Sequence, residues 1–304
     1  MIDTDTASDD AVALVMAFRL PEARVEAVTT VAGNVTLPLA TRNALITAEL
    51  CDADVPIYMG SHKPLVRPHE DATAIHGADG LGNTGYPDPD RKPEQQHAVD
   101  ALIARFLAEP GALTLVTLGP LTNIALAILR EPRFAAAVKE CYVMGGAANV
   151  IGNVTPSAEY NIWCDPEAAR IVFHSGMPLT MVPFELCLGG AMLDNAEADA
   201  LEAVGTPYAR FCVAINRFLV DSTAPLIETP GMNLPDPITV AIALDSTIMT
   251  RSGFFHVDVE TMSELTRGET VVDRFATLGK PPNVTVGLAS DGAAFKRMLH
   301  RACR

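Results

Sequence analysis

Positive charge is scarce in this sequence. Its 304 residues include Lys+Arg 22 against Asp+Glu 37, which gives a formal net charge of −15. A protein that grips the phosphate backbone of a nucleic acid polymer needs a basic surface, so we exclude a nucleic acid polymer as a partner. A small neutral or anionic ligand is compatible with this charge.

Long apolar runs and paired cysteines are also missing. No apolar run approaches the length that spans a bilayer, and the first residues, Met1-Ile2-Asp3, do not form a signal peptide. The six cysteines never form a CxxC pair, which in a chain this long indicates buried small side chains rather than disulfides or a zinc site: Cys51, Cys141, Cys164, Cys187, Cys212 and Cys303. We therefore expect a protein of the reducing cytoplasm with no membrane partner.

Internal repeats, low-complexity tracts and linkers are absent, so we expect one domain over residues 1–304. Short β-rich apolar runs alternate with amphipathic runs, which predicts an α/β fold with a mostly parallel, Rossmann-like sheet flanked by helices. The predicted strands are 25–31, 55–59, 113–118, 141–144, 179–184 and 284–288, and a hairpin is predicted within 257–272. The predicted helices are 11–18, 39–50, 97–107, 121–129, 167–173, 238–244 and 291–300.

Two segments interrupt this alternation. Residues 60–96 are rich in Pro, Gly and His without periodicity, and a loop of this length in a compact domain is usually functional. Residues 191–235 have helical character without strands, which predicts a helical cap or insertion near the site. Its large apolar side chains are candidates for stacking on a ligand or for an ordinary core: Tyr208, Phe211, Phe218 and Ile227.

Four carboxylates crowd into eight residues at the start of the chain: Asp3, Asp5, Asp9 and Asp10. Helix N-capping explains one or two of them, but four like charges raise one another's pKa unless a cation compensates. All-oxygen ligands favour Ca²⁺ or Mg²⁺ over zinc, and Leu14 at the twelfth position excludes an EF-hand. Since only two residues precede Asp3, either the first strand is unusually short or the sequence omits part of it.

One alternative for this segment is a phosphatase of the haloacid dehalogenase type. Residues 3–7, Asp-Thr-Asp-Thr-Ala, resemble the DxDxT loop of that family, with Asp3 as the nucleophile. Ala7 replaces the final Thr of the loop. Lys139 is a candidate for the required lysine, but no acidic pair for Mg²⁺ follows.

A second resemblance covers nearly the whole chain. The segment from Asp3 to Leu14 is similar to the DTDxxxDDAxAL signature of the inosine–uridine-preferring nucleoside hydrolases. Further motifs follow in the order and at the spacing of that family: TTVAGN at 29–34, HGADGLG at 76–82, LGPLTN at 118–123, MGG at 144–146, GN at 152–153, AEYN at 158–161, DPEAA at 165–169 and DP at 236–237. Together these motifs identify the chain as resembling this family.

The resemblance implies the nucleoside hydrolase fold and hydrolysis of the N-glycosidic bond of ribonucleosides to free base and ribose. It implies one Ca²⁺ bound by Asp5, Asp10, Asp236 and the backbone carbonyl of Leu118, with Asp9 as the general base that activates a metal-bound water. It also implies that the ribose hydroxyls are held by Asn34, Asn153, Glu159 and Asn161. The family is typically homodimeric or homotetrameric.

Elementary chemistry agrees with these roles, but each residue also has a simpler explanation. Carboxylate and amide oxygens around a sugar stabilise an oxocarbenium-like transition state. However, Asn34 and Asn153 each follow a glycine, as turn residues do. Asp236 before Pro237 is also compatible with a cap of the helix at 238–244, and Asp165 is predicted to be such a cap for the helix that follows it.

The sequence departs from the family at positions that matter for chemistry. Many members carry His immediately before the late Asp, where it protonates the departing base, but Pro235 stands there in this chain. His76 is the best substitute as leaving-group acid. Glu185 replaces the commoner Asp of the Pro-Leu-Asp-Val motif, and Thr6-Ala7 replaces Pro-Gly. A noncatalytic nucleoside- or ribose-binding protein is therefore an alternative.

Overall fold

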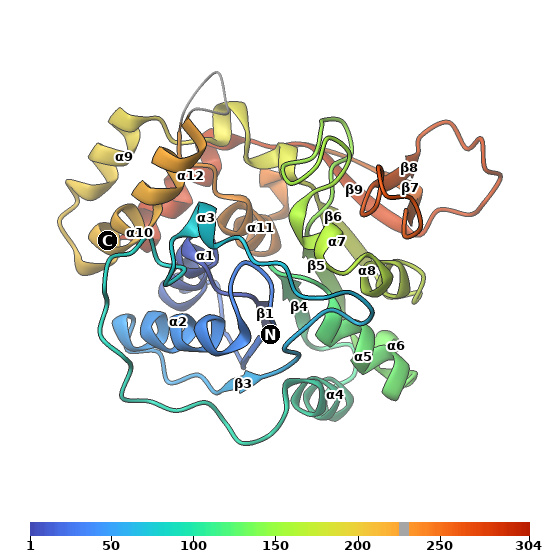
Figure 1. The fold of residues 1–304 in the computed structure, drawn as a ribbon, viewed down its shortest axis with the longest axis horizontal. Coiled ribbons are helices and arrows are strands. Elements are labelled where there is room, and N and C mark those ends of the chain that lie inside the picture. Colours follow the sequence, from blue (N-terminus) through green and yellow to red (C-terminus); the bar gives the residue numbers. More distant parts are fainter. Residues whose placement is uncertain (225–230) are drawn as a thin grey trace.

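The protein is built around one large β-sheet. A computed structural model describes residues 1–224 and 231–304 (Figure 1). In the described part, nine strands form a sheet in the order β3-β2-β1-β4-β5-β6-β9-β7-β8. The strands are β1 (Ile2–Thr4), β2 (Val28–Thr30), β3 (Ile57–Met59), β4 (Thr114–Thr117), β5 (Glu140–Met144), β6 (Leu179–Val182), β7 (Arg251–Val259), β8 (Thr270–Asp273) and β9 (Val284–Ala289).

The first six strands are parallel and follow the 3-2-1-4-5-6 order of doubly wound dinucleotide-binding folds. Strand β9 continues the parallel set beside β6, and the antiparallel β7 and β8 complete the sheet. The predicted α/β fold with a mostly parallel sheet is therefore confirmed. The hairpin predicted within 257–272 is present, with β7 beginning earlier, at Arg251.

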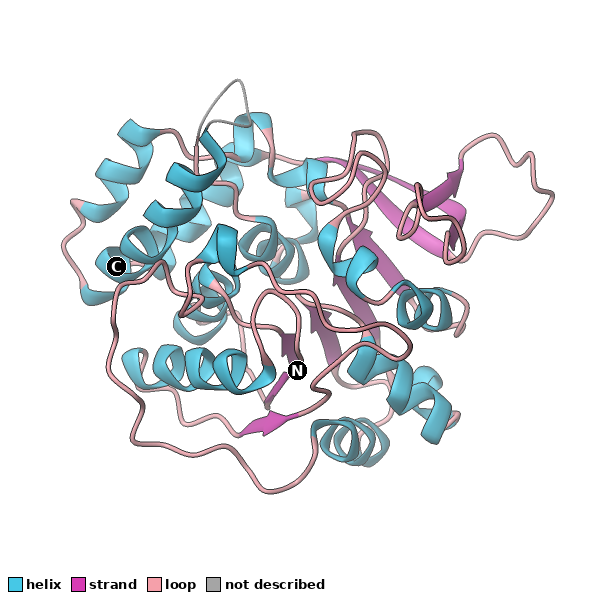
Figure 2. Cartoon of the chain, in the orientation of Figure 1, coloured by secondary structure: helices cyan, strands magenta, loops and turns pink. Residues whose placement is uncertain are grey.

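Helices cover both faces of the sheet (Figure 2). The α-helices are α1 (Ser8–Arg19), α2 (Leu37–Leu50), α3 (Thr73–His76), α4 (Ala98–Ala108), α5 (Thr122–Arg130), α6 (Arg133–Ala137), α7 (Tyr160–Cys164), α8 (Pro166–Phe173), α9 (Asn195–Glu202), α10 (Pro207–Thr223), α11 (Pro235–Leu244) and α12 (Gly292–Ala302). Short 3₁₀ helices are η1 (Phe184–Cys187), η2 (Gly189–Ala191) and η4 (Ser246–Ile248).

Two separate apolar cores result from this layering. Helices α1, α2, α10, α11 and α12 contribute to one core, and α4, α5, α6 and α8 to the other. Strand β5 contributes side chains to both cores. Tyr142 and Met144 belong to the first core, and Cys141 and Val143 belong to the second. This alternation explains why β5 is apolar from Cys141 to Met144, as strands covered on both faces are.

Most element predictions are right in type, and the errors lie at the boundaries. Strands β1, β2 and β3 have three residues each, shorter than the predicted 25–31 and 55–59, because apolar residues such as Val25 pack on the core outside the ladder. Helices α6 and α7 were not predicted; each has only five residues, too few to show a helical period. Among the described residues, no helix is both long and apolar enough to cross a bilayer.

The two irregular segments differ in structure. Within residues 60–96, only the short α3 and a bridge between Tyr58 and Glu94 are regular. Within 191–224, the part of the predicted helical segment before the undescribed residues, the helices are α9 and α10, and α10 packs on α1, α3 and α9. Phe211 is buried in the core there, so it is not free to stack on a ligand, and Ile227 lies outside the described residues.

Candidate active site

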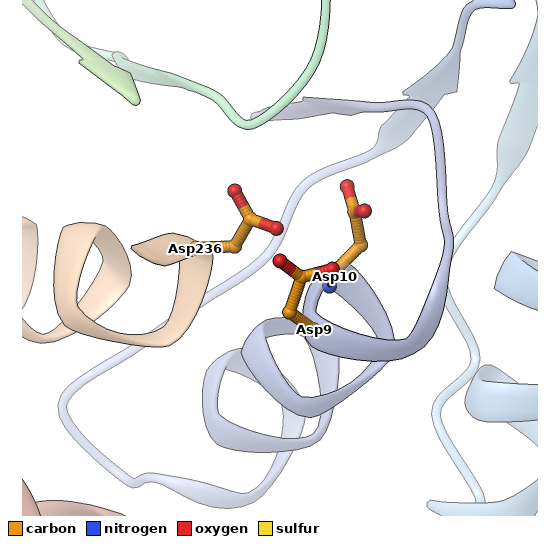
Figure 3. Close-up of side chains that lie close together, drawn as sticks. All are labelled: Asp9, Asp10 and Asp236. Atoms are coloured by element: carbon orange, nitrogen blue, oxygen red, sulfur yellow. Dashed lines mark hydrogen bonds between the residues drawn. The ribbon is translucent and has the colours of Figure 1, made fainter. Parts of the chain in front are cut away.

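Three aspartates converge where two helices begin. Asp9 and Asp10 lie in the first turn of α1, and Asp236 lies in the first turn of α11, which packs against α1. One carboxylate oxygen from each of the three lies within 4.8 Å of the others (Figure 3). The alternative that Asp236 caps a helix is wrong, because α11 begins at Pro235 and its N-cap residue is Leu234.

These carboxylates carry negative charge that the protein does not neutralise. Asp5, Asp9, Asp10 and Asp236 are all buried, with at most 6% of the surface exposed, at Asp9. None of them pairs with Lys or Arg in the described part of the chain. Burial raises the pKa of Asp9 and of Asp10 to about 6. Burial and the neighbouring carboxylates also raise the pKa of Asp5 and Asp236 well above the ordinary value.

Unsatisfied oxygen atoms in the cluster fit a hard divalent cation. Oδ1 of Asp5 and Oδ1 of Asp236 are buried without a hydrogen-bond partner among residues 1–224 and 231–304. Two glycines make room for the carboxylate of Asp5. A Cβ on Gly119 would lie 2.5 Å from its Oδ1, and a Cβ on Gly33 would collide with its Oδ2. Acceptor-only oxygens without a His or Cys ligand are the donor set of Ca²⁺ or Mg²⁺, so the residues present fit the implied metal.

Hydrogen bonds fix the orientation of the acidic side chains. Asp10 accepts from Thr4 Oγ1 at 2.6 Å and from the Ala7 N–H at 3.0 Å. Asp5 accepts from the Asn34 N–H at 2.5 Å, which ties the loop after β1 to the loop after β2. The structure thus brings Asp5 and Asn34 together, although the three oxygens within 4.8 Å come from Asp9, Asp10 and Asp236 rather than from Asp5.

Asp3 is not part of this cluster. Its carboxylate is fully buried and accepts from Thr29 Oγ1 at 2.5 Å and from Asn123 Nδ2 at 2.9 Å. Burial raises the pKa of Asp3 to about 7. Since Thr29 and Asn123 hold this carboxylate away from the cluster of Asp9, Asp10 and Asp236, the structure does not support Asp3 as the nucleophile that the phosphatase alternative needs.

A second group of polar side chains lies at the start of α7. Glu159 is the N-cap and accepts from the N–H groups of Asn161 (2.9 Å), Ile162 (3.3 Å) and Gly146 (2.9 Å). Burial raises its pKa to about 7. Asn161 Nδ2 donates to the Leu118 carbonyl at 2.8 Å. Glu159 and Asn161 of the AEYN motif and Leu118 of the LGPLTN motif therefore form one connected buried unit.

Asn153 occupies a different environment. It is exposed, and its Oδ1 accepts from the Tyr160 N–H at 2.9 Å, so its side chain closes the loop that precedes α7. Asp165 caps α8 by accepting from the Ala168 N–H, as predicted.

His76, the predicted leaving-group acid, is buried beside the carboxylates. Its Nδ1 lies 2.9 Å from Ser8 Oγ and 3.7 Å from Asp9 Oδ1. Burial lowers the pKa of His76 to about 4, so the imidazole is neutral at pH 7. Pro235, where many family members carry His, is the first residue of α11 and supplies no proton. Our sequence analysis did not identify Ser8, although its place one residue before the acidic pair is the available signal.

All these segments meet at one edge of the sheet. Asp5 follows β1, Asn34 follows β2, Leu118 follows β4 and Gly146 follows β5, so each contribution comes from the carboxyl end of a parallel strand. Chain connections diverge between β1 and β4, because β2 and β3 lie on one side and β5 and β6 on the other. Ligands of open α/β sheets bind at such a switch point.

Comparisons with known proteins agree with this geometry. A family profile described as inosine-uridine preferring nucleoside hydrolase matches residues 1–297. The chain is 39% identical over 302 residues to the pyrimidine-specific ribonucleoside hydrolase RihA of Shewanella sp. (strain MR-7), covering 98% of this chain and 94% of that protein. It is 37% identical over 299 residues to the non-specific ribonucleoside hydrolase RihC of Salmonella enteritidis PT4 (strain P125109), covering 98% and 95%.

Solved structures show the same relationship. A plant nucleoside hydrolase, the PpNRh1 enzyme, superposes with a TM-score of 0.94 at 33% identity, covering 99% of this chain and 97% of that one. A purine-preferring ribonucleoside hydrolase from Gardnerella vaginalis superposes with a TM-score of 0.90 at 29% identity, covering 99% and 96%. The chain belongs to the inosine–uridine preferring nucleoside hydrolase family, whose members are enzymes that hydrolyse N-glycosyl bonds.

Proposed function

We propose that this protein hydrolyses the N-glycosidic bond of ribonucleosides to free base and ribose, with Ca²⁺ as its cofactor. The observation that carries the proposal is the group of buried carboxylates without a cationic partner, Asp5, Asp9, Asp10 and Asp236, next to the polar unit of Glu159 and Asn161. Buried uncompensated charge is costly, so its presence here supports a functional requirement rather than a structural one.

The metal site of the proposal consists of Asp5, Asp10, Asp236 and the Leu118 carbonyl. When bound, Ca²⁺ would supply oxygen coordination for the ribose hydroxyls and lower the pKa of the attacking water. Support comes from the unpartnered Oδ1 atoms of Asp5 and Asp236. Calorimetric titration of the metal-free protein should give one Ca²⁺ per chain, and the Asp236→Asn variant should lose that binding.

Asp9 acts as general base in this proposal. It is the most exposed of the four carboxylates, so it is the best placed to meet a water molecule, and it lies at the positive end of α1. A large loss of kcat in Asp9→Asn at saturating Ca²⁺, with Ca²⁺ binding retained, tests this role.

The ribose is held by Asn34, Asn153, Glu159 and Asn161. Glu159 and Asn161 offer acceptors and donors in a fixed geometry because the N–H groups of α7 and the Leu118 carbonyl already orient them. As positive charge develops on the sugar, the surrounding carboxylates stabilise it. Contact between Asn153 and the ribose requires that the loop before α7 face the sugar. A rise in KM for the nucleoside in Asn153→Ala would support this contact.

His76 is the proposed leaving-group acid. A neutral imidazole still carries one N–H, and the 2.9 Å contact between Nδ1 and Ser8 Oγ holds the ring in place with either atom as the donor. The preference of this protein for purine or pyrimidine nucleosides must be measured, since the named relatives include pyrimidine-specific, non-specific and purine-preferring enzymes.

A reducing-sugar assay over a panel of purine and pyrimidine ribonucleosides, with and without a chelator, tests the whole proposal. Release of ribose that stops on chelation and returns with Ca²⁺ is the expected result. Binding of nucleosides without ribose release would instead identify a noncatalytic binding protein.

We further propose that the protein works as a homodimer or homotetramer in the cytoplasm. The β7–β8 hairpin region projects from one side (Figure 1) and exposes large apolar side chains, Phe254, Met262, Leu265 and Phe275. Such side chains are typical of a surface that a partner covers. Light scattering after size exclusion measures the oligomeric state.

All six cysteines are free and buried, which is compatible with a reducing compartment such as the cytoplasm.

A further inference from the structure

Glu185 lies in η1, directly after β6, at the same sheet edge as the candidate site. It is also the residue at which the sequence departs from the aspartate common in the family. We infer that Glu185 is a positioning residue: it fixes the loop after β5 and, through that loop, the ribose-binding carboxylate of Glu159. This inference rests on the proposed function for its effect on substrate, but not for its structural part.

The carboxylate of Glu185 is bound by the backbone of the loop. The Ala148 N–H lies 3.2 Å from both Oε1 and Oε2, and the Asn149 N–H donates to Oε1 at 2.8 Å. The Asn149 side chain adds a donor at 3.2 Å. One side chain therefore satisfies two consecutive backbone donors with charge-assisted hydrogen bonds, which are stronger than neutral ones.

The preceding residues of the loop are held from other directions. Thr270 of β8 binds Ala147 twice, donating to its carbonyl at 2.7 Å and accepting from its N–H at 3.1 Å. The Gly146 carbonyl accepts from the Phe184 N–H at 2.9 Å. Gly146 has φ +82°, and a Cβ there would lie 2.7 Å from Thr270 Cγ2, so no other residue fits this close approach.

One hydrogen bond connects the loop after β5 to the carboxylate of Glu159. The Gly146 N–H donates to Glu159 Oε2 at 2.9 Å, and the other two donors to Glu159 come from its own helix α7. Gly146 is therefore the contact that aligns the carboxylate of Glu159 with the end of β5. If the Glu185 anchor is lost, Ala148 and Asn149 lose their acceptor and only the bonds from Thr270 and the Phe184 N–H still hold Ala147 and Gly146, so the loop shifts more easily and Glu159 is held less firmly against the end of β5.

The length of the side chain also matters. Aspartate is one methylene shorter than glutamate, so its carboxylate falls short by roughly 1.5 Å, about one C–C bond. An aspartate at 185 could not reach both Ala148 and Asn149 without a shift of the loop. This chain and relatives with aspartate are therefore expected to hold the loop in different positions, which changes the opening beside the ribose site.

The test uses Glu185→Ala, Glu185→Asp and Glu185→Gln, with Glu140→Gln as the matched control. Glu140 is an exposed glutamate at the opposite end of β5, and its one side-chain hydrogen bond, from Tyr142 Oη, is a long 3.4 Å. Glu159 would grip the ribose in the ground state as well as in the transition state, so its misalignment raises KM more than it lowers kcat. We expect KM to rise about 10-fold in Glu185→Ala, less in Glu185→Asp and least in Glu185→Gln, and to stay at the wild-type value in Glu140→Gln.

Two further measurements separate positioning from general damage. In a Glu159→Gln background the effect of Glu185→Ala on KM should largely vanish, because coupled residues are not additive. Amide hydrogen exchange should accelerate at residues 146–149 in Glu185→Ala while the exchange of β5 stays unchanged. Exchange of the loop at the wild-type rate, or a KM within two-fold of wild type, overturns the inference. If wild-type protein releases no ribose, the proposed function fails instead, and the exchange data alone judge the role of Glu185.

Discussion

Replacing Asp10 by Asn should stabilise the metal-free protein at neutral pH while removing its response to Ca²⁺. Asp10 is fully buried beside Asp9, and burial raises its pKa from 3.8 to about 6. At ~1.36 kcal/mol per pKa unit, a raise of this size corresponds to roughly 3 kcal/mol of lost stability above pH 6. An uncharged isostere removes that cost.

Asp10→Asn also loses part of the hydrogen bonding of the Asp10 carboxylate. Asp10 accepts from Thr4 Oγ1 and from the Ala7 N–H, and asparagine keeps one acceptor oxygen, so one of these bonds must be remade. A hydrogen bond contributes about 1 kcal/mol net, which leaves a gain near 2 kcal/mol for Asp10→Asn at pH 7.5.

The sign of the pH dependence follows from the raised pKa. Between pH 4 and 6 the folded protein holds a proton on Asp10 that the unfolded chain has released, so the stability of the chelated protein falls as the pH rises through this window. His76 acts in the opposite direction, because its folded pKa of about 4 lies below the unfolded value. The charge of Asp10 raises the pKa of His76, so Asp10→Asn lowers that pKa further and the contribution of His76 cancels only in part between the two proteins.

Urea unfolding in chelator at pH 5.0 and pH 7.5 measures the effect, with Asp199→Asn at an exposed position as the control. The gain of Asp10→Asn over wild type should be larger at pH 7.5 than at pH 5.0, and added Ca²⁺ should stabilise only the wild type and the control. A variant that is less stable than wild type at pH 7.5, with the same difference at both pH values, would refute the reasoning.

Three other outcomes are expected. Asp9→Asn should lower kcat by about 10²–10⁴-fold with Ca²⁺ affinity retained in calorimetry, as the loss of a general base does; a variant with wild-type kcat would refute the general-base role of Asp9. His76→Ala should slow natural ribonucleosides more than p-nitrophenyl riboside, whose leaving group needs no proton, and equal losses on both substrates would contradict an acid role. Phe275→Ser with Leu265→Ser should reduce the oligomer measured by light scattering, and an unchanged mass would place the interface elsewhere.

The sheet and its connections were predictable because strand–helix alternation leaves a strong pattern. The strand ends were not, since burial and ladder pairing are separate properties, as Val25 shows by packing on the core outside the sheet. The short helix α7 has too few residues for a period, yet its N-cap Glu159 was identified from the family resemblance.

The candidate site was predictable as a set of motifs but not as a geometry. The sequence places Asp10 and Asp236 far apart, and only the packing of α1 on α11 brings their oxygens within 4.8 Å. Asp3 illustrates the converse: it stands two residues from Asp5, but it lies within β1 while Asp5 lies in the loop that follows, and its carboxylate accepts from Thr29 and Asn123 instead. No local pattern distinguishes these two fates.

The packing of α1 against α11 has a consequence for how the chain matures. The acidic cluster needs the first helix and residue 236, so it cannot exist until more than three quarters of the chain has been synthesised and folded. A ligand that binds there bridges residues more than 200 positions apart in the sequence, and because the site exists only in the folded protein, binding stabilises that state by mass action. We therefore expect cation binding only after the chain has folded as far as α11, because a fragment that lacks residue 236 does not contain the whole site.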